Sequence, residues 1–421
     1  MLLRFSVENF MSFKERAEII LEPSRDIDHP NSVVKKGPYK GLKFAAIYGA
    51  NAAGKSCFFK AMTIALLLVR TSNIRQINEP LGVNPFKFSK ESLSKPSKFE
   101  FQFLAGDGKK YIYGFSADSL RVYEEYLTCY SSRRPTKIFV RKSDGSYEFT
   151  AREKNNLSPL TQWNTPNKFF LATATMWNAQ STKPAMEWLT KGIDTYTDLG
   201  NITVEALQKY QSLETENYTN FATKLMNSAG IGVSKIDVRT KKAKVDPNLL
   251  PFVPSLIVNG QVHPFEPTQT EVTFIHGTTD ETGEAKQWGL SLDEESQGTQ
   301  VLFAFSPLLQ TVLNEGKTII IDEMDRSLHP KVVKCIVDLF QNPKTNPHGA
   351  QLIIITHDTS LMSLSLFRRD QFFFVEKDAK TGESSMYPLS EHPVRKSENI
   401  EKGYLQGRYG AVPDIKEGEF P

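Results

Sequence analysis

The stretch Leu42–Leu68, LKFAAIYGANAAGKSCFFKAMTIALLL, decides the fold of this chain. At its centre, Gly49–Ser56 (GANAAGKS) has a glycine, four free positions and then Gly-Lys-Ser. The apolar residues before this loop are typical of a short buried strand, and Phe58–Leu68 is typical of an apolar helix. Glycines let backbone N–H groups curl around phosphate oxygens, and the start of the helix points its positive end at them. The stretch therefore predicts a phosphate-binding loop rather than an ordinary glycine-rich turn.

This loop predicts a site for ATP and Mg²⁺. The Lys55 ammonium is expected to reach the β- and γ-phosphates, and the Ser56 hydroxyl is expected to bind Mg²⁺. Cys57 follows directly and is included in the predicted ATP contacts, although its side chain is typical of a small apolar filler. The predicted contacts of the loop with ATP are Gly49, Asn51, Ala52, Ala53, Gly54, Lys55, Ser56 and Cys57.

A second motif lies far along the chain, at Thr318–Glu323 (TIIIDE). Its apolar residues indicate a strand through the core, and Asp322 and Glu323 emerge at its carboxyl end, where ligands bind in open α/β sheets. Asp322 can hold Mg²⁺ directly or through water, while Glu323 can polarise the attacking water as a general base. The alternative is a strand that merely ends in an acidic turn, and it is less favoured because the phosphate loop is also present.

Gln351–Asp358 (QLIIITHD) repeats this design with a histidine at the strand tip. The His357 imidazole can donate to the γ-phosphate or orient the attacking water, although a lone histidine is more often structural. Asp325 follows Glu323 closely, and the nearby His329 and Pro330 either take part in the site or simply mark the start of a helix.

Ser296–Thr299 (SQGT) opens a predicted helix. A serine beside a glycine at a helix N-terminus presents a hydroxyl and free N–H groups, which suits an anion. Serine caps are common, so the motif gains its value from its place in the order: phosphate loop, insertion, serine-glycine helix start, acidic strand and histidine strand.

Composition describes an ordinary globular protein. The 421 residues suggest two lobes, and a net charge of +3, from 51 basic and 48 acidic residues, does not argue for wholesale nucleic-acid binding. The basic run Arg239–Lys244 is more typical of a solvated loop. We expect no signal peptide, no membrane span and a cytoplasmic location. The three cysteines argue against a disulfide framework and are Cys57, Cys129 and Cys335.

The elements predict an α/β fold with a mixed or parallel sheet, an antiparallel β lobe and an inserted helical lobe. Alternating strands of the β lobe are expected at Phe99–Leu104, Lys110–Phe115, Leu120–Tyr130 and Lys137–Val140. Helical spacing follows in Pro184–Ser228, and apolar strands alternate with helices after Thr299. We expect three parts: 1–183 as the first half of the head, 184–285 as the inserted lobe, and 286–421 as the second half.

The order of these motifs resembles the ATP-binding-cassette ATPases, in the non-transport branch related to structural-maintenance, Rad50 and RecF proteins. GANAAGKS resembles Walker A, and TIIIDEMDRSLHP resembles Walker B plus the D-loop, which would place Asp325 at a dimer contact. IITHD resembles the switch histidine. ESQGT resembles a divergent signature motif, which keeps Ser296 and Gly298 but has Gln297 where a glycine is usual.

Other segments are similar to a narrower group, the AAA-type ATPases of bacterial abortive-infection and restriction-linked loci. They are FFLATATMWN (Phe169–Asn178), DEMDRSLHP and the late YLQGRYGAVP (Tyr404–Pro413), whereas the opening LLRFSVENFMSFKE resembles the first strand of the broader branch. This RloA-like group is similar to the ATPase half of OLD-family nucleases. Too few residues follow His357 for the Toprim domain of those nucleases, so any effector is expected to be a separate protein. In the resembled family a glutamine links ATP to the inserted lobe. We assign this role to Gln180, which follows a predicted strand Phe169–Ala174, and we expect it to be a further Mg²⁺ contact. Gln102 is expected to be structural.

The resemblance implies that ATP and Mg²⁺ are sandwiched between two heads, in a homodimer or a higher oligomer. Ser296 and Gly298 of one copy would face the phosphate loop of the other. The implied function is an ATP-hydrolysing sensor or scaffold of an antiphage system that controls a nuclease or toxin. The alternative is a DNA repair ATPase of the Rad50 or RecF kind, which the missing long coiled coil and the balanced charge disfavour. A transporter subunit fits less well because the chain opens on a strand and carries a long inserted region between Walker A and the signature. A self-contained nuclease fits less well because the acid runs Glu124–Glu125 and Asp293–Glu295 are expected to face solvent.

Overall fold

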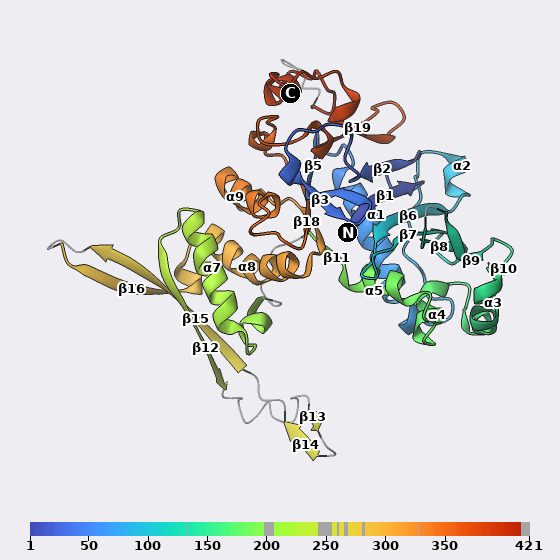
Figure 1. The fold of residues 1–421 in the computed structure, drawn as a ribbon, viewed down its shortest axis with the longest axis horizontal. Coiled ribbons are helices and arrows are strands. Elements are labelled where there is room, and N and C mark those ends of the chain that lie inside the picture. The colour runs from blue at the N-terminus through green and yellow to red at the C-terminus, as the bar shows by residue number, and fades with distance from the viewer. Residues whose placement is uncertain are drawn as a thin grey trace, which may run out of the picture. The chain divides into compact units, whose positions relative to one another are not determined.

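A computed structural model describes residues 1–132, 134–197, 206–242, 255–258, 261–264, 268–279, 283–326 and 328–413 (Figure 1). The chain divides into two compact units. The first comprises Met1–Thr197, Val312–Arg326 and Ile336–Pro421, and the second comprises Asp198–Thr311 and Ser327–Cys335.

The first unit contains a six-stranded sheet in the order β11-β17-β18-β5-β19-β20. Its strands are β5 (Phe44–Gly49), β11 (Ile193–Tyr196), β17 (Thr318–Asp322), β18 (Gln351–Ile355), β19 (Phe372–Lys377) and β20 (Ser384–Pro388). Five of them run parallel and β20 pairs antiparallel to β19. The apolar runs of β5, β17 and β18 are buried along almost their whole length, as a sheet covered on both faces requires. The predicted mixed α/β sheet is confirmed.

A seven-stranded antiparallel sheet in the order β10-β9-β8-β7-β6-β1-β2 completes this unit and confirms the predicted β lobe. Its strands are β1 (Leu2–Glu8), β2 (Ala17–Ile20), β6 (Ser97–Leu104), β7 (Lys110–Ala117), β8 (Val122–Tyr130), β9 (Thr136–Arg141) and β10 (Tyr147–Phe149). Helix α1 (Lys55–Arg70) contacts both sheets, since its residues pack against β1 and β5. The Phe58 ring of α1 lies 5.5 Å from Phe5 of β1, edge to face. One hydrophobic core therefore joins the two sheets through α1.

The remaining elements of the first unit are short. They include the hairpin β3 (Val33–Lys36) and β4 (Tyr39–Leu42), which lies in a segment whose sequence is polar, and the helices α2 (Lys90–Leu93), α3 (Ala151–Leu157), α4 (Phe170–Met176), α5 (Lys183–Lys191) and α10 (Ile400–Leu405). Helices α8 (Gln297–Glu315) and α9 (Pro330–Gln341) each include residues of both units.

The second unit has a three-stranded sheet in the order β12-β15-β16, and α7 packs against β12. These elements and a separate hairpin are α7 (Thr215–Ser228), β12 (Val233–Lys242), β13 (Ser255–Val258), β14 (Gln261–Pro264), β15 (Thr268–Thr279) and β16 (Ala285–Ser291). The Tyr210 ring stacks on Phe303 at 4.3 Å, and Phe274 meets Phe303 edge to face at 5.2 Å. These rings form the aromatic centre of the unit.

Two predictions about the β lobe are wrong, for one physical reason. Of Phe169–Ala174, expected as a strand, all residues after the cap residue Phe169 lie in helix α4, and Glu125, expected to face solvent, is fully buried. The Glu125 carboxylate accepts hydrogen bonds from the N–H groups of Phe170 (2.6 Å) and Leu171 (2.9 Å), in the first turn of α4. An acid placed there satisfies free N–H groups and complements the helix dipole. Burial raises the pKa of Glu125, although Arg141 and these hydrogen bonds oppose the shift.

The structure also corrects three smaller predictions about secondary structure and exposure. The helical pattern of Pro184–Ser228 missed strand β11 at the edge of the six-stranded sheet. The described part of the run Arg239–Lys244 belongs to the exposed end of β12 and is not a loop, and residues 243 and 244 lie outside the described residues. Glu295 is mostly buried and pairs with His276 at 2.5 Å, whereas Asp293 and Glu294 are exposed as expected.

Among the described helices, none has both the length and the apolar composition needed to cross a membrane.

Candidate functional site

The phosphate-loop segment joins β5, which ends at Gly49, to α1, which begins at Lys55. Both glycines of the motif are required by their surroundings. A side chain at Gly49 would collide with the backbone carbonyl oxygen of Val375 on β19. Gly54 has φ +117°, and a Cβ there would lie 2.5 Å from the Ser384 hydroxyl and 2.8 Å from the Ser12 hydroxyl. The loop is therefore enclosed by β19, β20 and the segment after β1.

We expect Gly54→Ala to destabilise the protein by about 1–3 kcal/mol, because it combines a strained backbone conformation with a collision. The matched control is Gly106→Ala, since Gly106 has no positive φ and a Cβ added there would meet nothing within 4 Å. The free energy of unfolding from urea denaturation measures both variants. Equal stability of the two would show that the loop is not closely packed.

The Lys55 side chain bends back against the backbone of the loop that precedes it. It is only 6% exposed, and its Nζ donates to the carbonyl oxygens of Gly49 (2.9 Å) and Ala50 (3.0 Å). Burial lowers the pKa of Lys55, and the charges of Asp322, Asp325 and Glu323 act in the opposite direction. The lysine and the acidic strand tip, 267 residues apart at their closest (322 − 55), are thus within electrostatic reach of each other.

Ser56 and Asp322 meet at the start of α1. Burial, followed by the charge of Glu323, raises the pKa of Asp322, while a hydrogen bond with the Ser56 side chain and the charge of Lys55 lower it. Asp322 Oδ1 is buried and has no hydrogen-bond partner among the described residues. A hydroxyl beside an unpaired carboxylate oxygen is a donor set that Mg²⁺ accepts. Within the described part of the chain no cluster of three His, Cys, Asp or Glu side chains could hold a metal alone, so the remaining ligands would be water and phosphate oxygens.

Glu323 follows in an unusual backbone conformation, with φ +55°. Its N–H donates to the carbonyl oxygen of Ile355, the last residue of β18, at 3.1 Å. Its carboxylate pairs with Arg326 at 3.3 Å, and these side chains are 48% and 80% exposed. An ion pair so exposed contributes little, so the Glu323 carboxylate can leave Arg326 readily.

His357 comes two residues after the end of β18. Strands β17, β18 and β5 are parallel neighbours, so their carboxyl ends lie at one edge of the sheet, with Asp322 opposite Ile355. The His357 backbone N–H donates to Asp325 Oδ2 at 3.2 Å. Burial and the charge of Lys55 lower the pKa of His357, against the opposing effect of the three nearby acids. The structure therefore brings the lysine loop, the acidic pair and the histidine together.

Ser296 and Gly298 belong to the second unit. The Ser296 hydroxyl accepts from the Thr299 N–H at 3.2 Å and also contacts the Thr299 hydroxyl at 2.8 Å, at the start of α8. The expected serine cap at a helix start is thus present, and its approach to the phosphate loop of a second copy stays a prediction.

The predicted Mg²⁺ contact Gln180 lacks the setting on which it was based, because the segment before it is a helix and not a strand. Its side chain is exposed and donates to the carbonyl oxygen (3.1 Å) and the side chain (2.9 Å) of Asn178. It lines a cavity of about 820 Å³ between β7, β8, α3 and the end of α4, and no residue of Gly49–Ser56 lines that cavity.

Several neighbours of the site were not found from the sequence. Ser384 donates to the Ala53 carbonyl oxygen at 2.6 Å, although 331 residues separate the two. No local pattern marks such a residue. His329 accepts from the Lys331 N–H at 3.2 Å beside Pro330, the first residue of α9, which favours a role at the helix start over a role in the site. Cys57 packs against the core, as expected of an apolar filler.

Comparison with known proteins gives one family. Residues 44–182 and 220–363 match the model of a family described as "AAA domain, putative AbiEii toxin, Type IV TA system". No curated protein matches the chain. Among solved structures, the SMC head domain from Thermotoga maritima is 13% identical with a TM-score of 0.41, over 92% of this chain and 98% of that one. The recombination mediator protein RecF, in complex with ATP, is 15% identical with a TM-score of 0.33, over 86% of this chain and 94% of that one.

Proposed function

The chain belongs to the AAA-domain family that is described as a putative AbiEii toxin of type IV toxin–antitoxin systems, and from this premise we propose that it binds and hydrolyses ATP. One observation carries the proposal. The Gly-Lys-Ser loop, the Ser56–Asp322 contact, Glu323 and His357 lie at one sheet edge, where nucleotides bind in α/β proteins.

In this mechanism each residue has a separate task. The loop N–H groups and the start of α1 hold the phosphates, and Lys55 turns from its own loop carbonyls to the β- and γ-phosphates. Ser56 and Asp322 would hold Mg²⁺, which neutralises charge on the phosphate oxygens. Glu323 takes the proton of a water whose oxygen attacks the γ-phosphorus, while the bond to the ADP oxygen breaks. His357, whose pKa is lowered by burial and by the charge of Lys55, orients that water or donates to the γ-phosphate.

We further propose that ATP acts as a switch of dimerisation. Ser296 and Gly298 lie at the start of the 19-residue helix α8, whose free N–H groups suit the γ-phosphate of a second copy. Association of two copies would then gain free energy from bound ATP and lose it on hydrolysis. Asp325 is the residue that we assign to the contact between copies.

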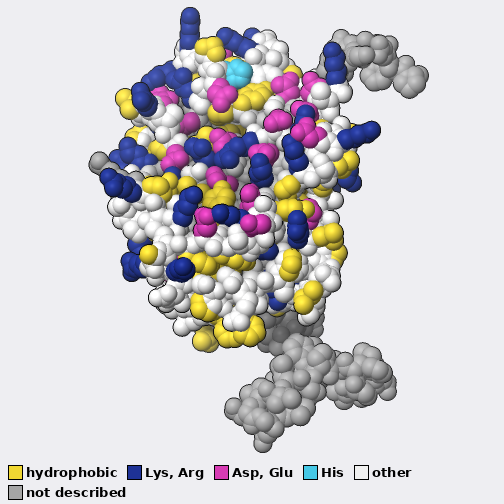
Figure 2. Space-filling view, turned by 90° about the vertical axis from the view of Figure 1, so that its right-hand side faces the viewer, with side chains coloured by type: hydrophobic (Ala, Val, Ile, Leu, Met, Phe, Trp, Pro, Cys, Tyr) yellow, Lys and Arg dark blue, Asp and Glu magenta, His cyan; other side chains and the backbone are white. Residues whose placement is uncertain are grey.

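The family description supports a role in defence, in which the ATP-bound dimer restrains a separate nuclease or toxin until a trigger releases it. The alternative, a DNA repair ATPase, gains no support from the face that Figure 2 shows. On that face Lys and Arg side chains are intermixed with Asp and Glu, whereas a DNA backbone is held by a stripe of basic side chains.

Two measurements test this proposal in sequence. The purified chain should release phosphate from ATP with Mg²⁺ and lose this activity when EDTA is added. Cells that carry the native locus should then resist phage, with plaque counts that fall for the wild-type ATPase and recover when Lys55 is replaced. ATP turnover without phage resistance, together with sensitivity to DNA damage when the gene is removed, would favour the repair role instead.

A further inference from the structure

The segment Asn399–Ala411, called the C-terminal segment below, is firmly docked on β19. The Tyr404 ring of α10 lies parallel to Phe374 at 5.4 Å and 13°, and the Tyr409 ring stacks on Phe374 at 6.0 Å and 18°. The Tyr404 hydroxyl donates to the Ala411 carbonyl oxygen at 3.1 Å, which closes the segment on itself. Gly403 is required here, because a Cβ would lie 2.7 Å from the Tyr409 hydroxyl.

Tyr48 connects this segment to the proposed ATP site. It directly precedes Gly49 and is only 1% exposed, and its ring lies 6.1 Å from Tyr404 and 6.5 Å from Phe374. Its hydroxyl donates to the backbone carbonyl oxygen of Asp358, the residue after His357, at 3.1 Å. A phenylalanine at this position would keep the packing of the ring and remove the hydrogen bond to Asp358.

A second contact reaches the same loop from α10. Thr359 Oγ1 donates to Glu401 Oε1 at 2.8 Å. The residues Thr356–Leu361, called the histidine loop below, are thus held by Asp325 through the His357 N–H, and by Tyr48 and Glu401 through the next two residues.

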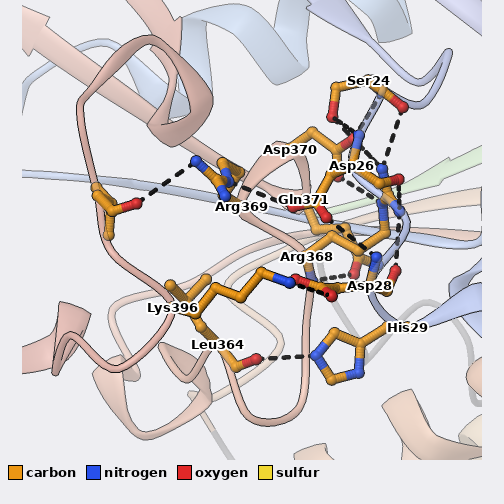
Figure 3. A network of polar contacts seen from close by, with 11 residues as sticks. Ser24, Asp26, Asp28, His29, Leu364, Arg368, Arg369, Asp370, Gln371 and Lys396 are labelled. Atoms are coloured by element: carbon orange, nitrogen blue, oxygen red, sulfur yellow. Dashed lines mark hydrogen bonds and ion pairs between the residues drawn. The ribbon is translucent and has the colours of Figure 1, made fainter.

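The chain is also fixed where it returns to the sheet (Figure 3). Arg368 is 2% exposed and forms two hydrogen bonds with Asp370, at 2.9 and 2.7 Å. Its Nη1 also donates to the carbonyl oxygens of Asp26 (2.7 Å) and Asp28 (2.9 Å). Lys396, just before the C-terminal segment, pairs with Asp28 at 2.7 Å. Because this anchor lies at the far end of the connection between β18 and β19, the position of His357 depends on the contacts nearer to it.

We propose that Tyr48 and Glu401 are positioning residues for His357, so that the C-terminal segment sets the geometry of the histidine loop and with it the rate of ATP hydrolysis. Neither residue is expected to touch ATP. The proposal rests on the proposed ATPase function. It predicts a loss of kcat without loss of ATP affinity, which a merely structural contact would not produce.

The test uses variants of the full chain that remove single hydrogen bonds. Tyr48→Phe should lower kcat about fivefold to tenfold, the effect of one lost hydrogen bond, with KM unchanged within about twofold. The matched control is Tyr210→Phe, since Tyr210 is also a buried tyrosine that donates to a backbone carbonyl oxygen, that of Phe303, at 3.1 Å. Glu401→Ala should lower kcat similarly, whereas Glu401→Gln, which keeps an acceptor oxygen for Thr359, should restore it.

Hydrogen exchange of peptides that cover 356–361, in the protein without nucleotide, gives a readout that does not need turnover. Exchange should be faster in Tyr48→Phe and Glu401→Ala, and unchanged in Tyr210→Phe. Wild-type kcat in an active Tyr48→Phe protein, or equal losses in Tyr48→Phe and Tyr210→Phe, would overturn the positioning role. If the wild type releases no phosphate, the ATPase proposal fails, and exchange alone then decides whether Tyr48 and Glu401 hold the loop.

Discussion

Replacing Glu323 with glutamine will stop ATP turnover while ATP stays bound. A general base contributes roughly 10²–10⁴-fold to a rate, so we expect phosphate release to fall by at least about 100-fold. Glutamine keeps the shape of the side chain and the backbone N–H bond to Ile355, and it gives up only an exposed ion pair with Arg326. The fold should therefore be unchanged.

The trapped ATP should also keep the proposed dimer together. Sedimentation velocity of Glu323→Gln with ATP and Mg²⁺ is expected to show a lasting dimer, where the wild type returns to monomer as ATP is consumed. Glu315→Gln is the control, because Glu315 is likewise exposed (54%) and paired with a basic residue, Lys317, at 2.7 Å. Turnover by Glu323→Gln within tenfold of the wild type would assign the base to another residue.

Lys55→Ala is expected to abolish nucleotide binding. The ammonium would make charge-assisted hydrogen bonds to phosphate, each of about 1.5–3 kcal/mol, so the loss of two corresponds to at least about a 100-fold weaker Kd. A fluorescent ATP analogue measures this affinity directly. Because Lys55 also donates to the carbonyl oxygens of Gly49 and Ala50, thermal unfolding must accompany the titration.

Lys60→Ala is the matched control, since Lys60 lies on the same helix and is exposed. We expect it to bind the analogue as the wild type does. A folded Lys55→Ala protein with wild-type affinity would mean that Gly49–Ser56 does not hold phosphate, and the proposed function would then be abandoned.

The parts of the fold that could be predicted are those whose causes are local. A run of apolar residues before a glycine-rich loop gives β5 and α1, and TIIID gives β17, because a buried parallel strand needs an unbroken apolar sequence. The positions of Lys55, Asp322 and His357 at one sheet edge then follow from the parallel strand order, which an α/β pattern implies.

The wrong predictions share a different cause, which is contact between distant residues. Phe169–Ala174 has a composition that suits either a strand or a helix, and a buried carboxylate 45 residues earlier, Glu125, decides for the helix. The assignment of Gln180 to Mg²⁺ depended on that strand. Likewise, nothing in the residues around Tyr48 or Ser384 shows that one holds the histidine loop and the other the phosphate loop.

The enclosure of Gly49–Ser56 by β19 and Ser384 has a consequence for synthesis of the protein. In a nascent chain the Gly-Lys-Ser sequence leaves the ribosome well before the acidic pair Asp322–Glu323 and before the walls formed by Val375 and Ser384, all of which lie far later in the sequence. Prematurely terminated products should therefore lack affinity for ATP although they contain the whole motif. Such fragments could not compete with complete molecules for nucleotide, and they could not replace one copy in the proposed dimer.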